Sequence, residues 1–398
     1  MNGLTPGNQH FRGETLGMRS LAIAAMLGLL AGARASAAEP AAAMFLCDPV
    51  HSGVHAADAL GVKLAPRWRF RTNQLNRSTP VVLDGVVYVG SNNGRFYALD
   101  AASGKPRWAF AAAGPVNSSA TVRAGVVYFA DDHAVYALDA WTGAKRWRAR
   151  FGPDVAHPGH DWDFFQSSPT VAGRRLYVGS GDGNLYAFDA ATGAPAWTFA
   201  TKGRVRSTPA VAGGTVYVGS FDGNLYAINA ESGTLRWRFK TKGNPDFPIG
   251  EVQSSPSVDG TTVFFGSRDG FLYAVDSRSG KKRWSVDEHE SWVISSPAFA
   301  NGTVFYGSSD GNAMRAIDER TGKRRWSFDA QGRVWSSPLL LDGRVYFGTG
   351  GGEVYWLDAR KGTMLGFADS EGTIYSSIGE GDSTIFYASD DGYVYAVK

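Results

Sequence analysis

Residues 207–239 read STPAVAGGTVYVGSFDGNLYAINAESGTLRWRF, and variants of this pattern recur along the chain. The stretch holds four short runs of strand-forming residues separated by turn residues. The first run follows Ser207-Thr208-Pro209, the second is TVYVGS, the third is NLYAIN and the fourth carries Trp237. Four short antiparallel strands in a unit of about 40 residues are typical of one blade of a β-propeller.

Eight copies of this unit can be aligned in the 398 residues. The aromatic residue of the third run marks each copy, and Arg315 replaces it in the sixth. These positions are Tyr97, Tyr136, Tyr186, Tyr226, Tyr273, Arg315, Tyr355 and Tyr395. Because each blade packs only on its neighbours, a chain of this length can form one ring. The sequence therefore predicts an all-β, eight-bladed propeller of four-stranded antiparallel blades.

A second signature lies in the hairpin between the third and fourth runs. It consists of Asp or Asn, then Gly four residues later, then Trp four residues after that. The triplets are Asp100/Gly104/Trp108, Asp139/Gly143/Trp147, Asp189/Gly193/Trp197, Asn229/Gly233/Trp237, Asp276/Gly280/Trp284 and Asp318/Gly322/Trp326. We expect the Asp to cap the turn, the Gly to take a left-handed conformation and the Trp to lie between blades. Gly366 replaces the tryptophan in the seventh copy, so we expect the weakest blade interface there.

The two ends of the chain indicate how the ring closes. The eighth copy stops after its third run, at Lys398, and residues 67–70 form an isolated fourth run before the first copy. Pairing the two would complete the eighth blade and remove its open edge. We therefore expect residues 66–398 to form the propeller, closed by an N-terminal strand. Residues 39–65 would be a lead segment, and residues 1–38 an N-terminal extension and signal peptide.

Residues 19–38 have the order of features found in secretory signals. Arg19 supplies a positive charge, residues 21–30 form an apolar run, and residues 35–38 offer small side chains for signal peptidase. The apolar run is short for a membrane span. We expect a periplasmic or secreted protein whose mature chain begins near Ala38. A buried or disordered N-terminal helix is the alternative.

Cysteine usage and charge exclude several classes of protein. Cys47 is the single cysteine, so there is no internal disulfide, no C-x-x-C-H haem motif and no cysteine pair for zinc. Bulky Met44, Phe45 and Leu46 precede it, which favours a free, partly buried thiol over a lipid anchor. The net charge is only +3 and the charges are interspersed, so we expect no nucleic-acid partner.

The hairpins of the form Ala-x-Asp-x-x-x-Thr-Gly-x-x-x-Trp, with VYVGS-xDG-xLYALDA, resemble the tryptophan-docking motifs of the pyrroloquinoline-quinone (PQQ)-like propeller superfamily. The resemblance covers residues 66–398. This superfamily includes PQQ-dependent alcohol dehydrogenases. It also includes non-enzymatic BamB-type subunits of the outer-membrane protein assembly machine. The resemblance implies the fold strongly and the function weakly.

The first strand of a propeller blade lines the centre of the ring, so the residue before each Ser-Ser or Ser-Thr step should lie at the channel mouth. Those residues are Arg77, Asn117, Gln166, Arg206, Gln253, Ile294, Trp335 and Tyr375. Two arginines with flanking amides suit a carboxylate or phosphate. Trp335 and Tyr375 suit stacking on a planar ligand. We expect a ligand or a protein partner to bind here. The alternative is a water-filled funnel whose polar side chains hydrogen-bond to one another.

Long connections between blades should reach the same face, where lengthened loops often bind partners. They span residues 152–165 and 241–252, and a shorter one spans residues 287–292. The first could offer metal ligands, but a loop with this spacing is a weak signal and we predict no metal site. The residues concerned are His157, His160, Asp161 and Asp163.

A PQQ-dependent dehydrogenase is the main alternative that the resemblance leaves open. Enzymes of that kind hold calcium through carboxylate and amide ligands and use a catalytic Asp, and many have an adjacent cysteine pair. No such calcium set can be assigned to the acidic residues near the mouth, which are Asp161, Asp163, Asp246 and Glu251. We therefore expect no cofactor and no catalytic residue. PQQ with Ca²⁺, acting on alcohols or sugars, remains the alternative, as does a sugar- or polymer-binding propeller.

We expect a monomeric ring that acts as a binding or scaffold protein of the cell envelope, with an envelope protein as partner, in outer-membrane protein assembly. The opposite face carries basic hairpin residues that could also bind an anionic envelope polymer or lipid, or could merely solvate the surface. Such binding would weaken steeply with salt. The residues are Lys105, Arg107, Lys145, Arg146, Lys281, Lys282, Arg283, Lys323, Arg324 and Arg325.

Overall fold

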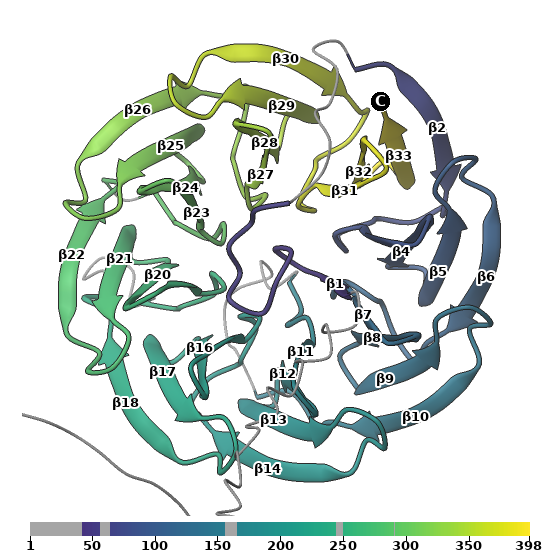
Figure 1. Ribbon diagram of the computed structural model, residues 1–398, viewed down its shortest axis with the longest axis horizontal. Coiled ribbons are helices and arrows are strands. Elements are labelled where there is room, and N and C mark those ends of the chain that lie inside the picture. The colour runs from purple at the N-terminus through teal and green to yellow at the C-terminus, as the bar shows by residue number, and fades with distance from the viewer. Residues whose placement is uncertain (1–41, 56–63, 156–164, 244–249, 290) are drawn as a thin grey trace, which may run out of the picture. The chain divides into compact units, whose positions relative to one another are not determined.

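Eight antiparallel sheets surround a common centre in the structure of the protein, a computed structural model (Figure 1). It describes residues 42–55, 64–155, 165–243, 250–289 and 291–398. The predicted signal peptide therefore lies outside the described residues, and so do His157, His160, Asp161, Asp163 and Asp246. Within the described ranges, no helix has the length and apolar character needed to cross a membrane.

Blades 1 to 4 follow one another along the chain, and each has the four strands that its repeat predicts. Blade 1 comprises β3 (Val81–Leu83), β4 (Val86–Ser91), β5 (Arg95–Asp100) and β6 (Pro106–Ala111). Blade 2 comprises β7 (Thr121–Arg123), β8 (Val126–Ala130), β9 (Ala134–Asp139) and β10 (Lys145–Arg150). Blade 3 comprises β11 (Thr170–Ala172), β12 (Arg175–Gly179), β13 (Asn184–Asp189) and β14 (Pro195–Ala200). Blade 4 comprises β15 (Ala210–Ala212), β16 (Thr215–Ser220), β17 (Asn224–Asn229) and β18 (Leu235–Lys240).

Blades 5 to 8 continue the ring, and the last blade is shared by both ends of the chain. Blade 5 comprises β19 (Ser257–Asp259), β20 (Thr262–Gly266), β21 (Phe271–Asp276) and β22 (Lys282–Asp287). Blade 6 comprises β23 (Ala298–Ala300), β24 (Thr303–Ser308), β25 (Ala313–Asp318) and β26 (Arg324–Asp329). Blade 7 comprises β27 (Leu339–Leu341), β28 (Arg344–Gly348), β29 (Glu353–Asp358) and β30 (Met364–Asp369). Blade 8 comprises β31 (Gly379–Gly381), β32 (Thr384–Ala388), β33 (Tyr393–Val397) and β2 (Pro66–Arg71).

The N-terminal strand closes the ring, as the sequence predicts. Strand β2 pairs antiparallel with β33, and Trp68 lies opposite Ala396 in this pairing. The outer edge of β33 is thereby covered, which leaves the eighth sheet complete. The predicted fold class, an eight-bladed all-β propeller, is confirmed.

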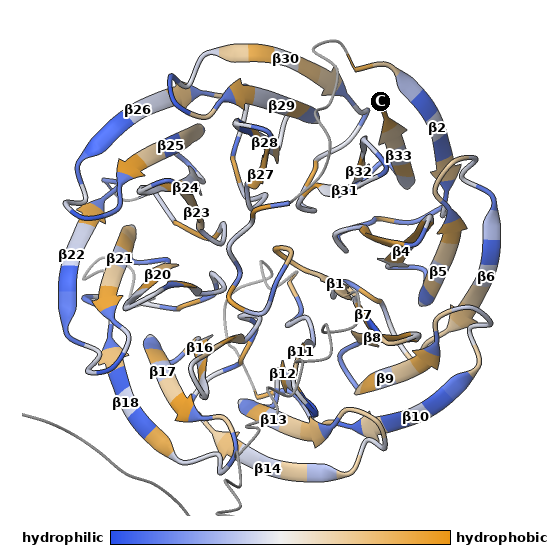
Figure 2. Ribbon diagram, viewed as in Figure 1, coloured by the Kyte–Doolittle hydropathy of each residue, from blue (hydrophilic) through white to orange (hydrophobic). Residues whose placement is uncertain are grey.

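The core lies between the blades. Every residue of β4 is buried, whereas the outermost strands β6 and β10 alternate between exposed and half-buried positions. Figure 2 shows the same division, with largely hydrophilic outer strands such as β10 and β22 around more apolar inner ones. The rings of Phe96 and Phe129 from neighbouring blades stack at 4.1 Å between centroids. Stacked aromatic layers of this kind bury much of the apolar area that holds the ring together.

Seven of the tryptophans that the structure describes dock between blades, each on the hairpin of the next blade. Nε1 of Trp68 donates a hydrogen bond to the carbonyl of Ala101 at 2.9 Å. A Cβ on Gly104 would lie only 2.6 Å from Cδ2 of Trp68, so no larger residue fits beneath the indole. As predicted, Asp100 caps this turn by accepting a bond from the Ser103 N–H at 3.0 Å. The other docked residues are Trp108, Trp147, Trp197, Trp237, Trp284 and Trp326.

The two hydroxyls of each Ser-Ser or Ser-Thr step have different tasks. In seven of the eight blades the first ties the inner strand to its own blade, as where Ser78 Oγ accepts the N–H of Gly90 at 3.0 Å. In blade 7, Ser336 Oγ instead donates to the Ser337 carbonyl at 3.4 Å. The second accepts an N–H from the preceding blade, as where Ser119 Oγ accepts the N–H of Thr79 at 3.0 Å. Eight such bonds form a closed circle, and we call the eight side chains the hydroxyl ring. They are Thr79, Ser119, Ser168, Thr208, Ser255, Ser296, Ser337 and Ser377.

The described part of the lead segment, residues 42–55, runs through the centre of the ring (purple in Figure 1). Its strand β1 (Ala42–Met44) pairs antiparallel with β7. Further on, its carbonyls accept bonds from inner-strand N–H groups, as from Val258 to Val50 at 2.9 Å. The other inner-strand donors are Val211, Phe299 and Leu340. These inner strands are sheet edges, so the lead segment satisfies backbone groups that would otherwise lack partners.

Candidate binding site at the channel mouth

The eight residues predicted at the channel mouth line one pocket, as their position before the Ser step implies. We call it the mouth pocket; its cavity is about 50 Å³. The hydroxyl ring forms its wall, and Phe45 of the lead segment contributes to its lining. The structure thus brings the predicted residues together, while their part in binding remains a prediction.

The two arginines of the mouth pocket are already engaged. Arg77 donates to both carboxylate oxygens of Asp390, with Nε at 3.2 Å from Oδ1 and Nη2 at 2.9 Å from Oδ2. Arg206 has a side chain only 6% exposed, and it pairs with Asp154 at 2.8 Å and with Asp132 at 3.4 Å. Burial raises the pKa of Asp390, and the bonds from Arg77 counteract this. The two guanidinium groups are therefore fixed by protein carboxylates.

A buried arginine that the sequence analysis did not single out organises the neighbouring arc. The side chain of Arg268 is 1% exposed and lies between the rings of Phe221, at 5.1 Å, and Trp292, at 4.9 Å. Its Nη1 bonds to Glu251 at 2.6 Å, and its Nε donates to Oε1 of Gln253 at 2.8 Å. Gln253 is thus held in one orientation, because a flipped amide would turn its NH₂ group toward the guanidinium.

The sequence did contain a signal for these partners. Arg268 stands just before the Asp-Gly turn between the second and third strands of its blade. The corresponding turn residues of other blades also reach the mouth residues, as where Asp390 binds Arg77. The other examples are Asp132, which pairs with Arg206, and Ser309, which accepts the Nε1–H of Trp335. Residues in or just before this turn therefore hold several of the predicted mouth residues in place.

The aromatic arc of the mouth stacks on itself. The rings of Trp335 and Tyr375 lie 4.6 Å apart and nearly parallel, at 5°. Arg77 covers Tyr375 at 4.7 Å, and Arg333 lies 5.6 Å from the Trp335 ring. Nε1 of Trp335 donates to Ser309 Oγ at 2.7 Å. Such cation–π and stacking contacts hold the arc in place.

Beside this stack is a second cavity, of about 250 Å³, which we call the aromatic pocket. It lies next to the mouth pocket, with which it shares several lining residues, and its walls are mostly apolar. Its lining residues are Phe165, Trp292, Ile294, Ser309, Asp310, Arg333, Trp335 and Tyr375. Phe165 and Asp154 come from the first long loop, so the described part of that loop contributes to both arcs as expected.

The amide pair of the mouth links two blades. Oε1 of Gln166 accepts the backbone N–H groups of Asn117, at 2.9 Å, and Ser118, at 3.1 Å. Oδ1 of Asn117 is buried and has no hydrogen-bond partner among the described residues. This arrangement is closer to the alternative interpretation of the sequence, in which the polar groups at the mouth hydrogen-bond to one another. A few buried polar atoms, such as Asn117 Oδ1, have no partner among the described residues.

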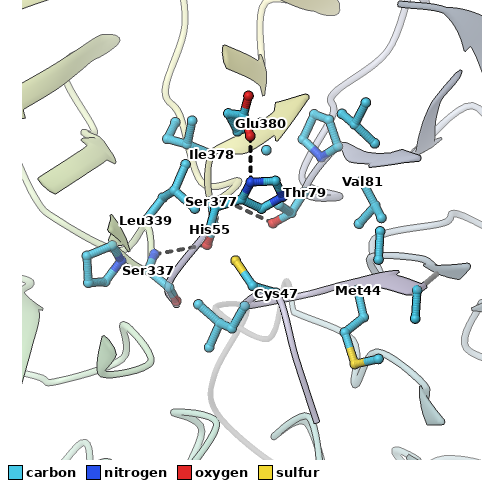
Figure 3. Close-up of a pocket in the computed structure, with 17 residues that line it drawn as sticks. Met44, Cys47, His55, Thr79, Val81, Ser337, Leu339, Ser377, Ile378 and Glu380 are labelled. Carbon is cyan, nitrogen blue, oxygen red and sulfur yellow. Dashed lines mark hydrogen bonds and ion pairs between the residues drawn. The ribbon is translucent and has the colours of Figure 1, made fainter. Parts of the chain in front are cut away.

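A thiol, an imidazole and a carboxylate share a separate pocket between the lead segment and blade 8 (Figure 3). Nδ1 of His55 lies 2.5 Å from Oε2 of Glu380, and Cys47 lines the same cavity. Burial raises the pKa of the Cys47 thiol well above its usual range, helped by Asp48 and Glu380. A thiol that stays protonated is a poor nucleophile. In the part of the chain that the structure describes, no three such side chains are placed to hold a metal.

On the opposite face, four of the predicted basic residues pair within their own hairpins. Nη2 of Arg107 lies 2.8 Å from Asp100 Oδ2, and this bond, followed by those from Ser103, lowers the pKa of Asp100 to about 2. The same pair recurs in three further blades as Arg146–Asp139, Arg283–Asp276 and Arg325–Asp318. Exposed pairs of this kind add little stability, but they reduce the charge that an anionic partner would meet.

Comparisons with known proteins agree with the fold. A family model described as outer membrane protein assembly factor BamB matches residues 54–159, 131–291 and 268–395. The dehydrogenase subunit of a quinone alcohol dehydrogenase from Gluconobacter oxydans (strain 621H) is 33% identical over 159 residues, which is 35% of this chain. That match spans 21% of the Gluconobacter protein, so the similarity concerns a fraction of its length.

Two solved structures share the ring architecture. The crystal structure of BamB from Moraxella catarrhalis superposes with a TM-score of 0.67 at 20% identity, over 84% of this chain and 100% of that chain. A europium-containing methanol dehydrogenase superposes with a TM-score of 0.74 at 14% identity, over 89% of this chain and 98% of that chain. Identities this low support the fold alone, since one fold serves several functions.

Proposed function

The chain belongs to the PQQ-like β-propeller family described as outer membrane protein assembly factor BamB, and from this membership we propose that it is an exported binding protein of the cell envelope. It would act in outer-membrane protein assembly by holding an envelope protein on its channel-mouth face. It would work as a rigid platform rather than as a catalyst.

The observation that carries this proposal is the stacked pair Trp335–Tyr375 beside the aromatic pocket. Aromatic residues and arginines are the residue types that most often dominate protein–protein binding energy. Here both types converge, since Arg333 flanks Trp335 and has a side chain 47% exposed. Their mutual contacts fix them before any partner arrives, which lowers the entropy cost of association.

A second candidate is PQQ-dependent oxidation of an alcohol or sugar, which the similarity to the Gluconobacter dehydrogenase subunit favours. The mouth residues do not fit that cofactor. No Asp or Glu is among the described residues that line the mouth pocket, whereas calcium prefers carboxylate oxygens. One face of Trp335 is covered by Tyr375, and Arg333 lies 5.6 Å from its ring, so a planar quinone would have to displace the stack.

Affinity capture from an envelope extract tests the binding proposal. We expect the wild-type protein to enrich subunits of the outer-membrane protein assembly machine. An Arg333→Ala/Trp335→Ala variant should lose this enrichment while still folding as judged by circular dichroism. A Trp141→Ala variant is a suitable control, because that exposed tryptophan lies in a hairpin of the opposite face. Equal capture by wild type and the double variant would contradict the proposal.

Titration with PQQ and Ca²⁺, followed by a dye-reduction assay with alcohols and sugars, tests the second candidate. We expect neither saturable PQQ binding nor turnover. Turnover that depends on both PQQ and Ca²⁺ would replace the binding proposal with the enzymatic one.

Export forms part of the proposal and has its own test. N-terminal sequencing of protein from the extracytoplasmic fraction should give a start near Ala38 or Glu39, after the small residues of the predicted cleavage site. An intact Met1 or Met18 in the fractionated protein would rule this out.

A further inference from the structure

The wall of the mouth pocket is rich in hydrogen-bond donors. Each oxygen of the hydroxyl ring accepts a backbone N–H, as in the bond from Ser296 N to Ser337 Oγ at 2.9 Å. A hydroxyl that accepts a bond in this way still has its own O–H to donate. Because the ring lines the mouth pocket on all sides, its O–H groups supply donors from every blade.

A buried amide in the same pocket lacks an acceptor. Gln253 is 4% exposed, and its Nε2 has no hydrogen-bond partner among the described residues. Its Oε1 is held by Nε of Arg268 at 2.8 Å, so the amide cannot turn to bury the NH₂ group elsewhere. A buried donor left without an acceptor costs about 1–3 kcal/mol. An acceptor placed in the pocket would recover that free energy.

The surplus of donors and the size of the cavity narrow the choice of acceptor. The described lining of the mouth pocket contains no acidic residue, and its two arginines, Arg77 and Arg206, are already paired with carboxylates outside that lining. Asn117, whose Oδ1 is unpartnered, can present its NH₂ group instead by rotating its amide. A cavity of about 50 Å³ exceeds the roughly 10–15 Å³ that one water requires, so it has room for a group of a few atoms.

We propose that the mouth pocket is a binding site for a compact oxyanion, whose oxygens accept bonds from the Gln253 amide and the hydroxyl ring. The group is a carboxylate or an ion of similar size, such as phosphate. It comes either from a free ion or from an acidic side chain of a bound chain. The site stands on its own residues, so it does not depend on the identity of any protein partner.

Calorimetric titration with sodium acetate and with inorganic phosphate, at ionic strength held constant with chloride, tests the site. We expect saturable binding of at least one of the two ions to the wild-type protein. The Gln253→Glu variant should weaken it by at least about tenfold, because glutamate keeps the contact with Arg268 but offers no donor and repels an anion. Gln331→Leu is the matched control, since Gln331 is an exposed glutamine outside the pocket, and it should bind as the wild type does.

A short peptide containing glutamate, compared with the same peptide containing glutamine, identifies the source of the group. Binding of the glutamate peptide alone, tighter than that of acetate, assigns the site to a side chain of a bound chain. Binding of acetate or phosphate as tightly as the peptide assigns it to a free ion. The proposal is overturned if no probe binds saturably, or if Gln253→Glu, folded by circular dichroism, binds as tightly as the wild type.

Discussion

Trp356 on β29 lies directly opposite Gly366 on β30, the reverse of the pair found in every other blade. Elsewhere the third strand supplies alanine and the outer strand supplies the docking tryptophan, as with Ala98 and Trp108. A Cβ at Gly366 would lie 2.3 Å from Cζ2 of Trp356, so the indole fills the space that a side chain would need.

The reversal has a physical cause in how the ring closes. A docking tryptophan packs on the hairpin between the third and fourth strands of the next blade. Blade 8 has no such hairpin, because its third strand ends near Lys398 and its fourth strand is β2. Trp356 instead packs inward, in a cluster with Tyr387 and Val397 of blade 8. That this interface is the weakest in the ring remains a prediction from the sequence, although Trp356 supplies an indole to it.

Because the indole of Trp356 fills the space beside Gly366, substitutions at these two positions should not have independent effects on stability. We expect Gly366→Ala to lower the free energy of unfolding by about 1–3 kcal/mol through overpacking. In a Trp356→Ala background the same substitution should cost much less, with a coupling of at least about 1 kcal/mol. Denaturant unfolding of the two single variants and the double variant measures this. Additive effects would mean that the two positions do not compete for space.

Docked and exposed tryptophans should differ sharply in their effect on stability. Trp237 packs between blades 4 and 5 and bonds to the carbonyl of Ser277 at 3.0 Å. We expect Trp237→Ala to destabilise the protein by about 3–5 kcal/mol, as for large core aromatics. Trp141→Ala, at a position 58% exposed, should change unfolding by less than about 0.5 kcal/mol. Similar midpoints for the two variants in urea would contradict the docking role.

Much of this fold follows from local sequence signals, because each blade repeats the same turn and strand chemistry. The Asp-Gly-Trp spacing predicts tryptophans between blades, and the structure confirms it. The spacing does not reveal that Trp108, four residues after Gly104, packs on Gly143 of the next blade. The course of the lead segment is also absent from the sequence pattern, since it bonds through backbone carbonyls that any residue carries.

The candidate site was predictable in position but not in its contacts. The Ser step fixes where the first strand begins, so the residue before it can be assigned to the mouth. The partners come from distant parts of the chain, as with Arg206 and Asp132. Nothing in the order of residues indicates that the two would meet. The same applies to Arg268, which lies outside the predicted set yet orients Gln253.

His51 should make stability depend on pH. It is fully buried in the lead segment, and burial lowers the pKa of its imidazole from 6.5 to about 4, against opposing effects of its bond to Pro256 and of Asp48. The unfolded chain therefore takes up this proton at higher pH than the folded chain. Stability is lost as the pH falls from 6.5 to 4, by up to about 3 kcal/mol.

Unfolding free energies measured across that pH range test the assignment. His51→Asn, which keeps a donor for the Pro256 carbonyl, should flatten the decline between pH 6.5 and 4. His289→Asn changes a histidine in an exposed loop and should leave the slope as in the wild type. An unchanged slope in His51→Asn would assign the pH dependence to other groups.

The lead segment should protect the inner strands from exchange with solvent. Val211, Val258, Phe299 and Leu340 donate their N–H groups to it. In a chain that begins at Leu64 these amides lose their acceptors, so their hydrogen exchange should speed up by at least about tenfold. Amides of the middle strands, such as Tyr226 in β17, should keep their protection. Unchanged exchange at the four inner-strand amides would mean that the segment does not occupy the centre in solution.

Substitution of Arg206 should lower the stability of the protein, whereas substitution of Arg333 should weaken binding at the mouth. The sequence alone suggests that Arg206 matters for binding and little for stability, but its side chain is 6% exposed and paired with Asp132 and Asp154. Arg206→Ala leaves both carboxylates without their guanidinium partner, so we expect a loss of about 1–3 kcal/mol in unfolding free energy. Arg333→Ala removes an exposed side chain from the aromatic pocket and should cost less than about 0.5 kcal/mol, while weakening capture of the partner. Urea unfolding and affinity capture of both variants decide the matter. If Arg206→Ala unfolds at the wild-type midpoint, its ion pairs with Asp132 and Asp154 contribute nothing to stability. If Arg333→Ala captures the partner as the wild type does, the binding surface lies elsewhere.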